Sequence, residues 1–202
     1  MTRYVTYLIL GPPGSGKGTQ GRVLGTVPRF VHFACGDVFR SLDTRTPMGQ
    51  RFIEYSSKGL LVPDDLTVEL WRHSIEAQVV TAKFKPDIDA LVLDGIPRNP
   101  NQARLMGEMI DVRQVFHLSC PNRDELVRRL RKRALKDNRL DDANETVIRQ
   151  RLETYDRETK PVLDYYRDIV KRIDALQPPI KVLHDIIASI WKGRNGTLTF
   201  HD

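Results

Sequence analysis

Short apolar runs alternate along the chain with longer segments of helical periodicity. Runs rich in β-branched and aromatic residues predict strands at Tyr4–Leu10, Phe30–Phe33, Ala90–Leu93, Gln114–Leu118 and Ile169–Ile173. The segments between and after them predict helices at Lys17–Leu24, Leu66–Val80, Asn101–Met109, Asn122–Arg133, Glu145–Tyr155 and Ile180–Trp191. This alternation is typical of βαβ units, so the pattern predicts an α/β fold in which helices flank a five-stranded parallel sheet.

The organisation is that of a single domain over residues 1–202. No repeat and no low-complexity linker interrupts the pattern. Asn122 followed by Glu125 resembles a capping box, with Pro121 just outside the helix. The tail 193–202 has little periodicity, and we expect it to fray.

Composition narrows the class of protein. Hydrophobic residues make up 40% and charged residues 29% of the 202 residues, which are values of a globular chain. No apolar run approaches the roughly 20 residues of a membrane helix, and the N-terminal run lacks the pattern of a signal peptide. Cys35 and Cys120 are the only cysteines, so we expect neither a disulfide framework nor a zinc site. A reducing cytoplasm is therefore the default location.

The chain is basic, with a formal net charge of +6. Such a charge invites a nucleic-acid-binding interpretation. The arginines, however, concentrate in residues 123–151 and beside motifs that would bind phosphate. Small phosphorylated substrates therefore explain much of the excess.

A glycine-rich loop follows the first predicted strand and carries the strongest chemical signal. Residues 11–17 contain three glycines and Lys17 in the spacing Gly-x-x-x-x-Gly-Lys. Such glycines let successive backbone N–H groups point into one concavity, and the start of the next helix adds partial positive charge. Lys17 can then reach the outer phosphates. The loop predicts binding of a nucleoside polyphosphate in a P-loop NTPase fold.

One residue departs from the commonest form of this loop. Gly18 stands where a Ser or Thr hydroxyl usually ligates magnesium, and Thr19 comes one position later. A protein with Gly18 must hold Mg²⁺ mainly through phosphates and water, which disfavours a GTPase arrangement. The loop closely resembles that of the adenylate kinase family of nucleoside monophosphate (NMP) kinases.

Three further segments support this resemblance, and the first two form a helical insert at 36–65. The sequence Gly36-Asp37-Val38-Phe39-Arg40 is similar to the family's Gly-Asp-x-x-Arg, where the arginine grips the acceptor phosphate. Cys35 precedes it, where the adenylate kinases usually have a Thr that touches the base. Leu61 and Val62 resemble the segment that lines the base pocket. The resemblance implies that residues 36–65 bind the monophosphate.

The third segment, Asp94-Gly95-Ile96-Pro97-Arg98, follows the predicted strand at 90–93 and is similar to the family's Asp-Gly-Phe-Pro-Arg. Asp94 suits the orientation of magnesium-bound water, with no direct protein ligand to the metal. Arg98 offers a planar fork to a phosphate. Gln102 carries an amide that can pair with adenine, and it favours AMP because related uridylate–cytidylate kinases tend to have Asn there.

An arginine cluster completes the pattern. Arg129 and Arg133 share one helix face, where like charges repel unless an anion lies near them. The resemblance implies a short lid at 133–139, and it places Arg139 and Arg151 at the transferred group. Because the stretch before Arg151 is one residue longer than usual, Arg149 remains a rival to Arg151.

Together these matches imply an adenylate kinase that catalyses the reaction ATP + AMP = 2 ADP, with Mg²⁺ carried by ATP. The implied catalytic residues are Lys17, Arg98, Arg129, Arg139 and Arg151. The implied ATP site is Gly14, Ser15, Gly16, Lys17, Gly18, Thr19, Arg129, Arg133 and Gln177. The implied AMP site is Cys35, Arg40, Leu61, Val62, Gly95, Arg98, Gln102, Arg139 and Arg151. No general base and no role for the five histidines are predicted.

Two alternatives stay open. One is a kinase of the same fold that accepts UMP or CMP, which Cys35 leaves possible. The other is a nucleotide- or nucleic-acid-binding protein without turnover, which the net charge favours. For the adenylate kinase interpretation we expect small nucleotides as partners, neither nucleic acid nor membrane, a monomer, and closure of both inserts over the substrates.

Overall fold

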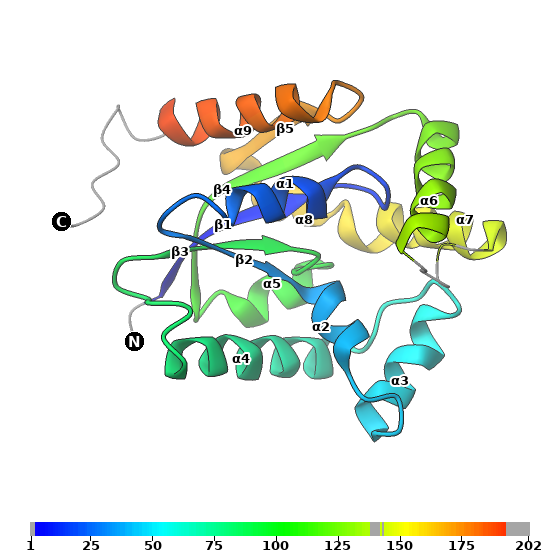
Figure 1. The fold of residues 1–202 in the computed structure, drawn as a ribbon, viewed down its shortest axis with the longest axis horizontal. Coiled ribbons are helices and arrows are strands. Elements are labelled where there is room, and N and C mark those ends of the chain that lie inside the picture. Colours follow the sequence, from blue (N-terminus) through cyan, green and yellow to red (C-terminus); the bar gives the residue numbers. More distant parts are fainter. Residues whose placement is uncertain (1–2, 138–141, 143, 193–202) are drawn as a thin grey trace.

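The sheet has five parallel strands in the order β2-β3-β1-β4-β5 (Figure 1). The computed structural model describes residues 3–137, 142 and 144–192. The strands are β1 (Tyr4–Leu10), β2 (Phe30–Ala34), β3 (Ala90–Asp94), β4 (Ile110–Ser119) and β5 (Val170–Asp174). The predicted α/β class and the five-stranded parallel sheet are confirmed.

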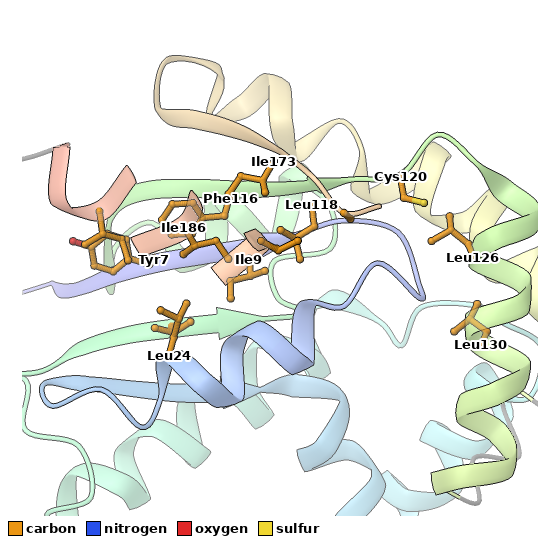
Figure 2. Close-up of a cluster of buried hydrophobic side chains, with 14 of the residues drawn as sticks. Tyr7, Ile9, Leu24, Phe116, Leu118, Cys120, Leu126, Leu130, Ile173 and Ile186 are labelled. Carbon is orange, nitrogen blue, oxygen red and sulfur yellow. The ribbon is translucent and has the colours of Figure 1, made fainter. Parts of the chain in front are cut away.

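Alternate residues of β1 supply two hydrophobic cores, one on each face of the sheet. Tyr7 and Ile9 lie in the cluster under α1 (Lys17–Leu24) and α9 (Pro179–Lys192). This cluster continues to α6 (Arg123–Asp137), from which Leu126 and Leu130 point towards it (Figure 2). Leu8 and Leu10 lie in the opposite cluster, which the period of two along a strand requires. That cluster includes residues of α4 (Asp64–Val80), α5 (Pro100–Met106) and α8 (Val162–Tyr165).

The start of β4 was not predicted, and the helix before it was predicted too long. Strand β4 begins at Ile110, which pairs with Tyr4, four residues before the predicted start. Asp111 and Arg113 interrupt the apolar pattern there, and they form an ion pair of 2.7 Å at the surface. Helix α5 ends at Met106 rather than at the predicted Met109, because the chain must turn to enter the strand.

The strand carboxyl ends face a group of helices at one end of the sheet (Figure 1). These are α2 (Cys35–Ser41), α3 (Pro47–Ser56), α6 and α7 (Glu145–Thr154), which continues as a π-helical turn at Tyr155–Thr159. The segment 36–65, predicted as a helical insert, holds most of α2, all of α3 and the start of α4. In the predicted lid at 133–139, residues 133–137 end α6, whereas 138 and 139 lie outside the described residues, as do 193–202.

A glycine in α3 allows the insert to pack closely. A Cβ atom at Gly49 would lie 2.2 Å from the carbonyl oxygen of Asp43 and 2.9 Å from the Cα of Thr44. The Asp43 oxygen is fixed because it accepts hydrogen bonds from the N–H and the Oγ1 of Thr46, at 3.0 and 2.7 Å. The backbone of this turn therefore cannot move away from a Cβ atom at position 49 without weakening these hydrogen bonds.

We expect Gly49→Ala to destabilise the insert, although alanine favours a helix by about 1 kcal/mol over glycine. Overpacking against fixed backbone costs about 1–3 kcal/mol, which outweighs that gain. Hydrogen exchange of the amides in 43–56 measures the effect, and exposed Gln50→Ala is the matched control in the same helix. Slower exchange in Gly49→Ala than in the parent protein would contradict the expected clash.

Candidate functional site

A cavity of about 560 Å³ lies where the strands end, and it collects the predicted site residues. Its lining includes the loop residues Gly14, Ser15, Gly16, Lys17, Gly18 and Thr19. From other elements come Cys35, Arg40, Leu61, Val62, Asp94, Gly95, Arg98, Gln102, Arg129, Arg133, Arg151 and Gln177. Arg139 lies outside the described residues. Every other residue predicted for the site lines this one cavity.

The glycine-rich loop turns sharply between β1 and α1. Gly14 and Gly16 adopt φ angles of 83° and 95°, which favour glycine. A Cβ atom at Gly14 would lie 3.0 Å from the carbonyl oxygen of Leu126, so the tip of the loop lies against α6. Strand, turn and helix therefore set the loop at the base of the cavity, with α1 beginning at Lys17.

Lys17 is half-buried and folds back over the loop. Its Nζ donates to the carbonyl oxygens of Gly11 at 2.8 Å and Pro12 at 3.1 Å. Burial is the main cause that lowers the pKa of Lys17 to about 8, and the nearby arginines Arg98, Arg133 and Arg151 lower it further, whereas Asp94 opposes them. A phosphate placed beside the ammonium group would favour its charged form and raise this pKa.

Asp94 ends β3 beside the start of α1. A Cβ atom at Gly18 would lie 3.3 Å from Oδ2 of Asp94, so the absent side chain leaves room for the carboxylate. Among the described residues, no group of three His, Cys, Asp or Glu side chains could hold a metal ion. Mg²⁺ is often bound by one or two carboxylates together with substrate phosphates and water. The single carboxylate of Asp94 fits this mode and does not fit an all-protein metal cage.

Arg98 and Gln102 follow β3 and are fixed by hydrogen bonds. The Nε of Arg98 donates to the carbonyl oxygen of Gly95 at 2.9 Å, a contact that does not use the two outer nitrogens of the guanidinium. Gln102 is 1% exposed, and its Oε1 accepts the backbone N–H of Arg98 at 2.7 Å. The two side chains that the sequence predicted for a phosphate and a base are therefore parts of one rigid turn.

The insert contributes the opposite wall of the cavity. Arg40 forms an ion pair with Asp37 one turn earlier in α2. Cys35 is 3% exposed, and burial raises the pKa of its thiol to about 12. The thiol is therefore neutral, and it offers only a weak hydrogen bond where the family that the sequence resembles usually has a Thr hydroxyl.

Two arginines of α6 share one face without direct repulsion, because each has its own carboxylate. The Nε of Arg129 donates to Glu125 at 2.7 Å, and its Nη1 donates to the carbonyl oxygen of Ala175 at 2.9 Å. Arg133 donates from Nε to Asp142 at 2.7 Å. The predicted cap at Asn122 forms, since its Oδ1 accepts the N–H of Glu125 at 3.0 Å, but the Glu125 carboxylate turns to the arginines instead of completing the capping box.

The structure separates Arg151 from its rival Arg149. Arg151 lines the cavity, its side chain is 17% exposed, and it forms an ion pair with fully buried Asp142. Arg149 is 58% exposed and pairs with Glu145 at 2.7 Å on the outer face of α7. Arg151, not Arg149, is therefore the arginine that faces the site.

Sequence reasoning missed two polar contacts near the cavity. Asp64 accepts hydrogen bonds from the side chains of Asn99, Asn101 and Gln102. An acidic residue at a helix start is so common that nothing in the sequence set it apart. The hydroxyl of Tyr155 lies 3.2 Å from Nε2 of His117, and burial, then Arg172, lowers the pKa of that histidine to about 4.

Comparisons with known proteins agree with this geometry. The family model described as adenylate kinase matches residues 9–171. The adenylate kinase of Thermus thermophilus is 36% identical over 191 residues, which cover 91% of this chain and 95% of that protein. The adenylate kinase of Thermobifida fusca is 36% identical over 85% of this chain and 90% of its own length. That of Chlamydia caviae is 34% identical over 93% of this chain and 98% of its own length.

In the part of the chain that the structure describes, no helix is long and apolar enough to cross a membrane. The family model spans the end of β1 from Ile9, the glycine-rich loop, the insert and the arginine-bearing helices α6 and α7, so the match covers most of the elements that line the cavity. The chain belongs to the adenylate kinase family.

Proposed function

We propose that this protein catalyses the reversible transfer of the γ-phosphoryl group of ATP to AMP, giving two molecules of ADP. The observation that carries the proposal is the convergence of cationic side chains from separate elements on one cavity. Lys17 comes from the loop after β1, Arg98 from the turn after β3, and Arg133 and Arg151 from α6 and α7. Phosphoryl transfer needs such a group, because negative charge spreads over the transferred oxygens.

The reaction needs no general base. The attacking atom is a phosphate oxygen of the monophosphate, which is largely ionised near neutral pH because its second pKa is about 6. Burial is the main cause that lowers the pKa of His117 to about 4, and the charges of Arg172, Lys160 and Lys17 lower it further, so this histidine is a poor base at neutral pH. The residues therefore contribute by alignment and by charge.

Donor and acceptor occupy different parts of the cavity in this proposal. The loop and Lys17 hold the phosphates of ATP, with its base near Arg129 and Gln177, while Arg40 and the insert hold AMP. Arg98 and Arg151 lie between these parts and bind the transferred group. The carboxylate of Asp94 would hold Mg²⁺ carried by ATP through its water, and the ion would supply charge that offsets that of the phosphates.

Water must be kept away from the γ-phosphate, because it competes with AMP as acceptor. The insert already touches α7, since the Oγ1 of Thr154 donates to the carbonyl oxygen of Gly59 at 3.1 Å. A Cβ atom at Gly59 would lie 3.1 Å from the Cγ of Arg151. We propose that closure of segments 36–65 and 133–139 over the substrates completes the exclusion of water.

One coupled assay tests the function. The protein is offered ATP and Mg²⁺ together with AMP, UMP, CMP or GMP, and formation of nucleoside diphosphates is measured. We expect AMP to give a kcat/KM at least about tenfold above that of any other acceptor, because Gln102 can pair with adenine. Preference for UMP or CMP would favour the related kinases of this fold, and no turnover with any acceptor would favour a binding protein.

The pKa of Lys17 predicts how ATP binding depends on pH. In the free protein this pKa is about 8, and bound phosphates raise it, so below pH 8 the ammonium is charged in both states. Above that pH the free protein must take up a proton when it binds ATP. We therefore expect the affinity for ATP to fall by up to about tenfold per pH unit above the free pKa.

Titration calorimetry between about pH 7.5 and 9.5, in buffers of different ionisation enthalpy, measures both the affinity and the proton uptake. The Lys17→Met variant is the control, since it lacks the titrating group and should lose this part of the pH dependence. An affinity for ATP that stays constant up to pH 9.5 in the parent protein would contradict the proposal that ATP binding requires the charged form of Lys17.

A further inference from the structure

The amide of Gln102 is held from both sides inside the protein. Its Oε1 accepts the backbone N–H of Arg98 at 2.7 Å, and its Nε2 donates to Oδ1 of Asp64 at 2.9 Å. The residue is 1% exposed, so water offers no ready alternative partner. Because a carboxylate only accepts and a backbone N–H only donates, just one of the two amide orientations satisfies both neighbours.

Asp64 is fixed in turn by two further amides. Asn99 donates to its Oδ1 and Asn101 to its Oδ2, both at 2.7 Å. Burial alone would raise the pKa of Asp64, but the hydrogen bonds from Asn101, Asn99 and Gln102 outweigh it and lower the pKa. The group is therefore an anion at neutral pH. Reversing the Gln102 amide would set Oε1 against this anion and Nε2 against the Arg98 N–H.

The fixed amide still has capacity to bind. One hydrogen of Nε2 and one lone pair of Oε1 remain after both contacts are counted, and Gln102 lines the cavity. At its Watson–Crick edge, a 6-amino purine presents an amino donor beside the N1 acceptor, whereas a 6-keto purine presents a carbonyl acceptor beside an N1–H donor. A bidentate amide therefore needs opposite orientations for the two bases.

We propose that Asp64 is a positioning residue that fixes, through Gln102, the amide orientation selecting a 6-amino base over a 6-keto base. The inference rests on the proposed function, because it takes the base of AMP to face Gln102. Asp64 does not line the cavity, so it acts on the base only through the amide.

The test compares AMP with IMP, which differ at this edge of the base. In the parent protein we expect kcat/KM to favour AMP by at least about a hundredfold, because a mismatched base leaves buried polar groups unpaired. In Asp64→Ala we expect the ratio of kcat/KM for AMP to that for IMP to fall by about tenfold or more. The reason is that only the Arg98 N–H then opposes reversal of the Gln102 amide. Both substrates are measured on one preparation, so any inactive fraction cancels from the ratio.

Two variants separate positioning from a general loss of structure. Asp64→Asn keeps an acceptor for Gln102 and gives up the contact with exposed Asn101, so its ratio should stay within about threefold of the parent value. Asp65→Ala removes an exposed charge from the same helix start and should leave the ratio unchanged. Should Asp64→Ala fail to fold, Asp64→Ser is measured in its place, since its short hydroxyl does not restore the carboxylate contact.

Equal losses with AMP and IMP in Asp64→Ala would overturn the inference and leave the proposed function standing. A parent protein that phosphorylates AMP but hardly distinguishes it from IMP would do the same. Failure of the parent protein to phosphorylate AMP would overturn both, and it is visible before any variant is made.

Discussion

Replacing Lys17 with methionine is expected to lower the turnover of ATP and AMP at least about a hundredfold, because one charge-stabilising contact to the transferred group contributes on the order of 3 kcal/mol. Methionine keeps much of the length and the apolar stem of the side chain but carries no charge. The buried ammonium lies in the loop at the base of the cavity, where its Nζ is hydrogen-bonded to Gly11 and Pro12. The loss should therefore appear in kcat, with little change in KM for AMP.

The fold should survive this change. Burial already disfavours the charged form of Lys17, since it lowers the pKa to about 8, so an apolar side chain relieves a desolvation cost. We expect the melting temperature of Lys17→Met to equal or exceed that of the parent protein. Lys83→Met, which changes an exposed lysine remote from the cavity, is the control for the loss of one positive charge. Turnover near the parent level in Lys17→Met would contradict the proposed catalytic role of Lys17.

The elements that the sequence predicted best are those with unbroken apolar patterns. Strand β1 and helix α1 have the predicted bounds, because the run of apolar residues ends where the glycine-rich loop begins. The first residues of β4 were missed since Asp111 and Arg113 face outward there. The hydrophobic pattern of a sequence indicates which residues are buried. A strand that is half exposed at one end has a less regular pattern there, so its first residues are harder to predict.

The helices of the insert show a different limit. Neither α2 nor α3 was predicted separately, and both are short, with seven and ten residues. They are joined by the stacked rings of Phe39 and Phe52, whose centroids lie 5.2 Å apart. Helices of this length depend on tertiary packing more than on propensity, so the sequence predicted a helical segment but not its bounds.

Lys17, Asp94 and Arg98 could be found from the sequence because they follow strands of the sheet, and the remaining site residues were found through the resemblance to the family. Their partners could not. Asp64 meets Gln102 across 38 residues of chain, and Asp142 brings together Arg133 and Arg151 from two helices. Such pairings depend on how α4, α6 and α7 pack, and the spacing of residues within one segment of the sequence does not show this packing. They are what orients the predicted side chains.

The second large expected effect is a loss of kcat, and it concerns Arg151, one of the two partners of Asp142. It should distinguish Arg151 from Arg149, which lies only two residues away. We expect Arg151→Ala to lower kcat with ATP and AMP at least about a hundredfold, because the side chain faces the cavity and would stabilise charge on the transferred group. Loss of Arg151 also leaves the fully buried carboxylate of Asp142 with one arginine partner instead of two. An uncompensated buried charge is costly, so some stability should be lost as well.

Arg149→Ala is the matched control, and it should lower kcat by no more than about threefold, since exposed ion pairs such as the one with Glu145 contribute at most about 1 kcal/mol. Both side chains leave the same helix and carry the same charge, so the comparison cancels long-range electrostatics and helix propensity. A double variant, Arg151→Ala with Asp142→Asn, removes the buried negative charge that has lost one of its two partners, and it should regain stability without regaining turnover. Recovery of kcat in that double variant would mean that Arg151 acts only by neutralising Asp142. Equal losses of kcat in the two single variants would mean that α7 acts through its overall positive charge and not through a direct contact of Arg151 with the phosphates.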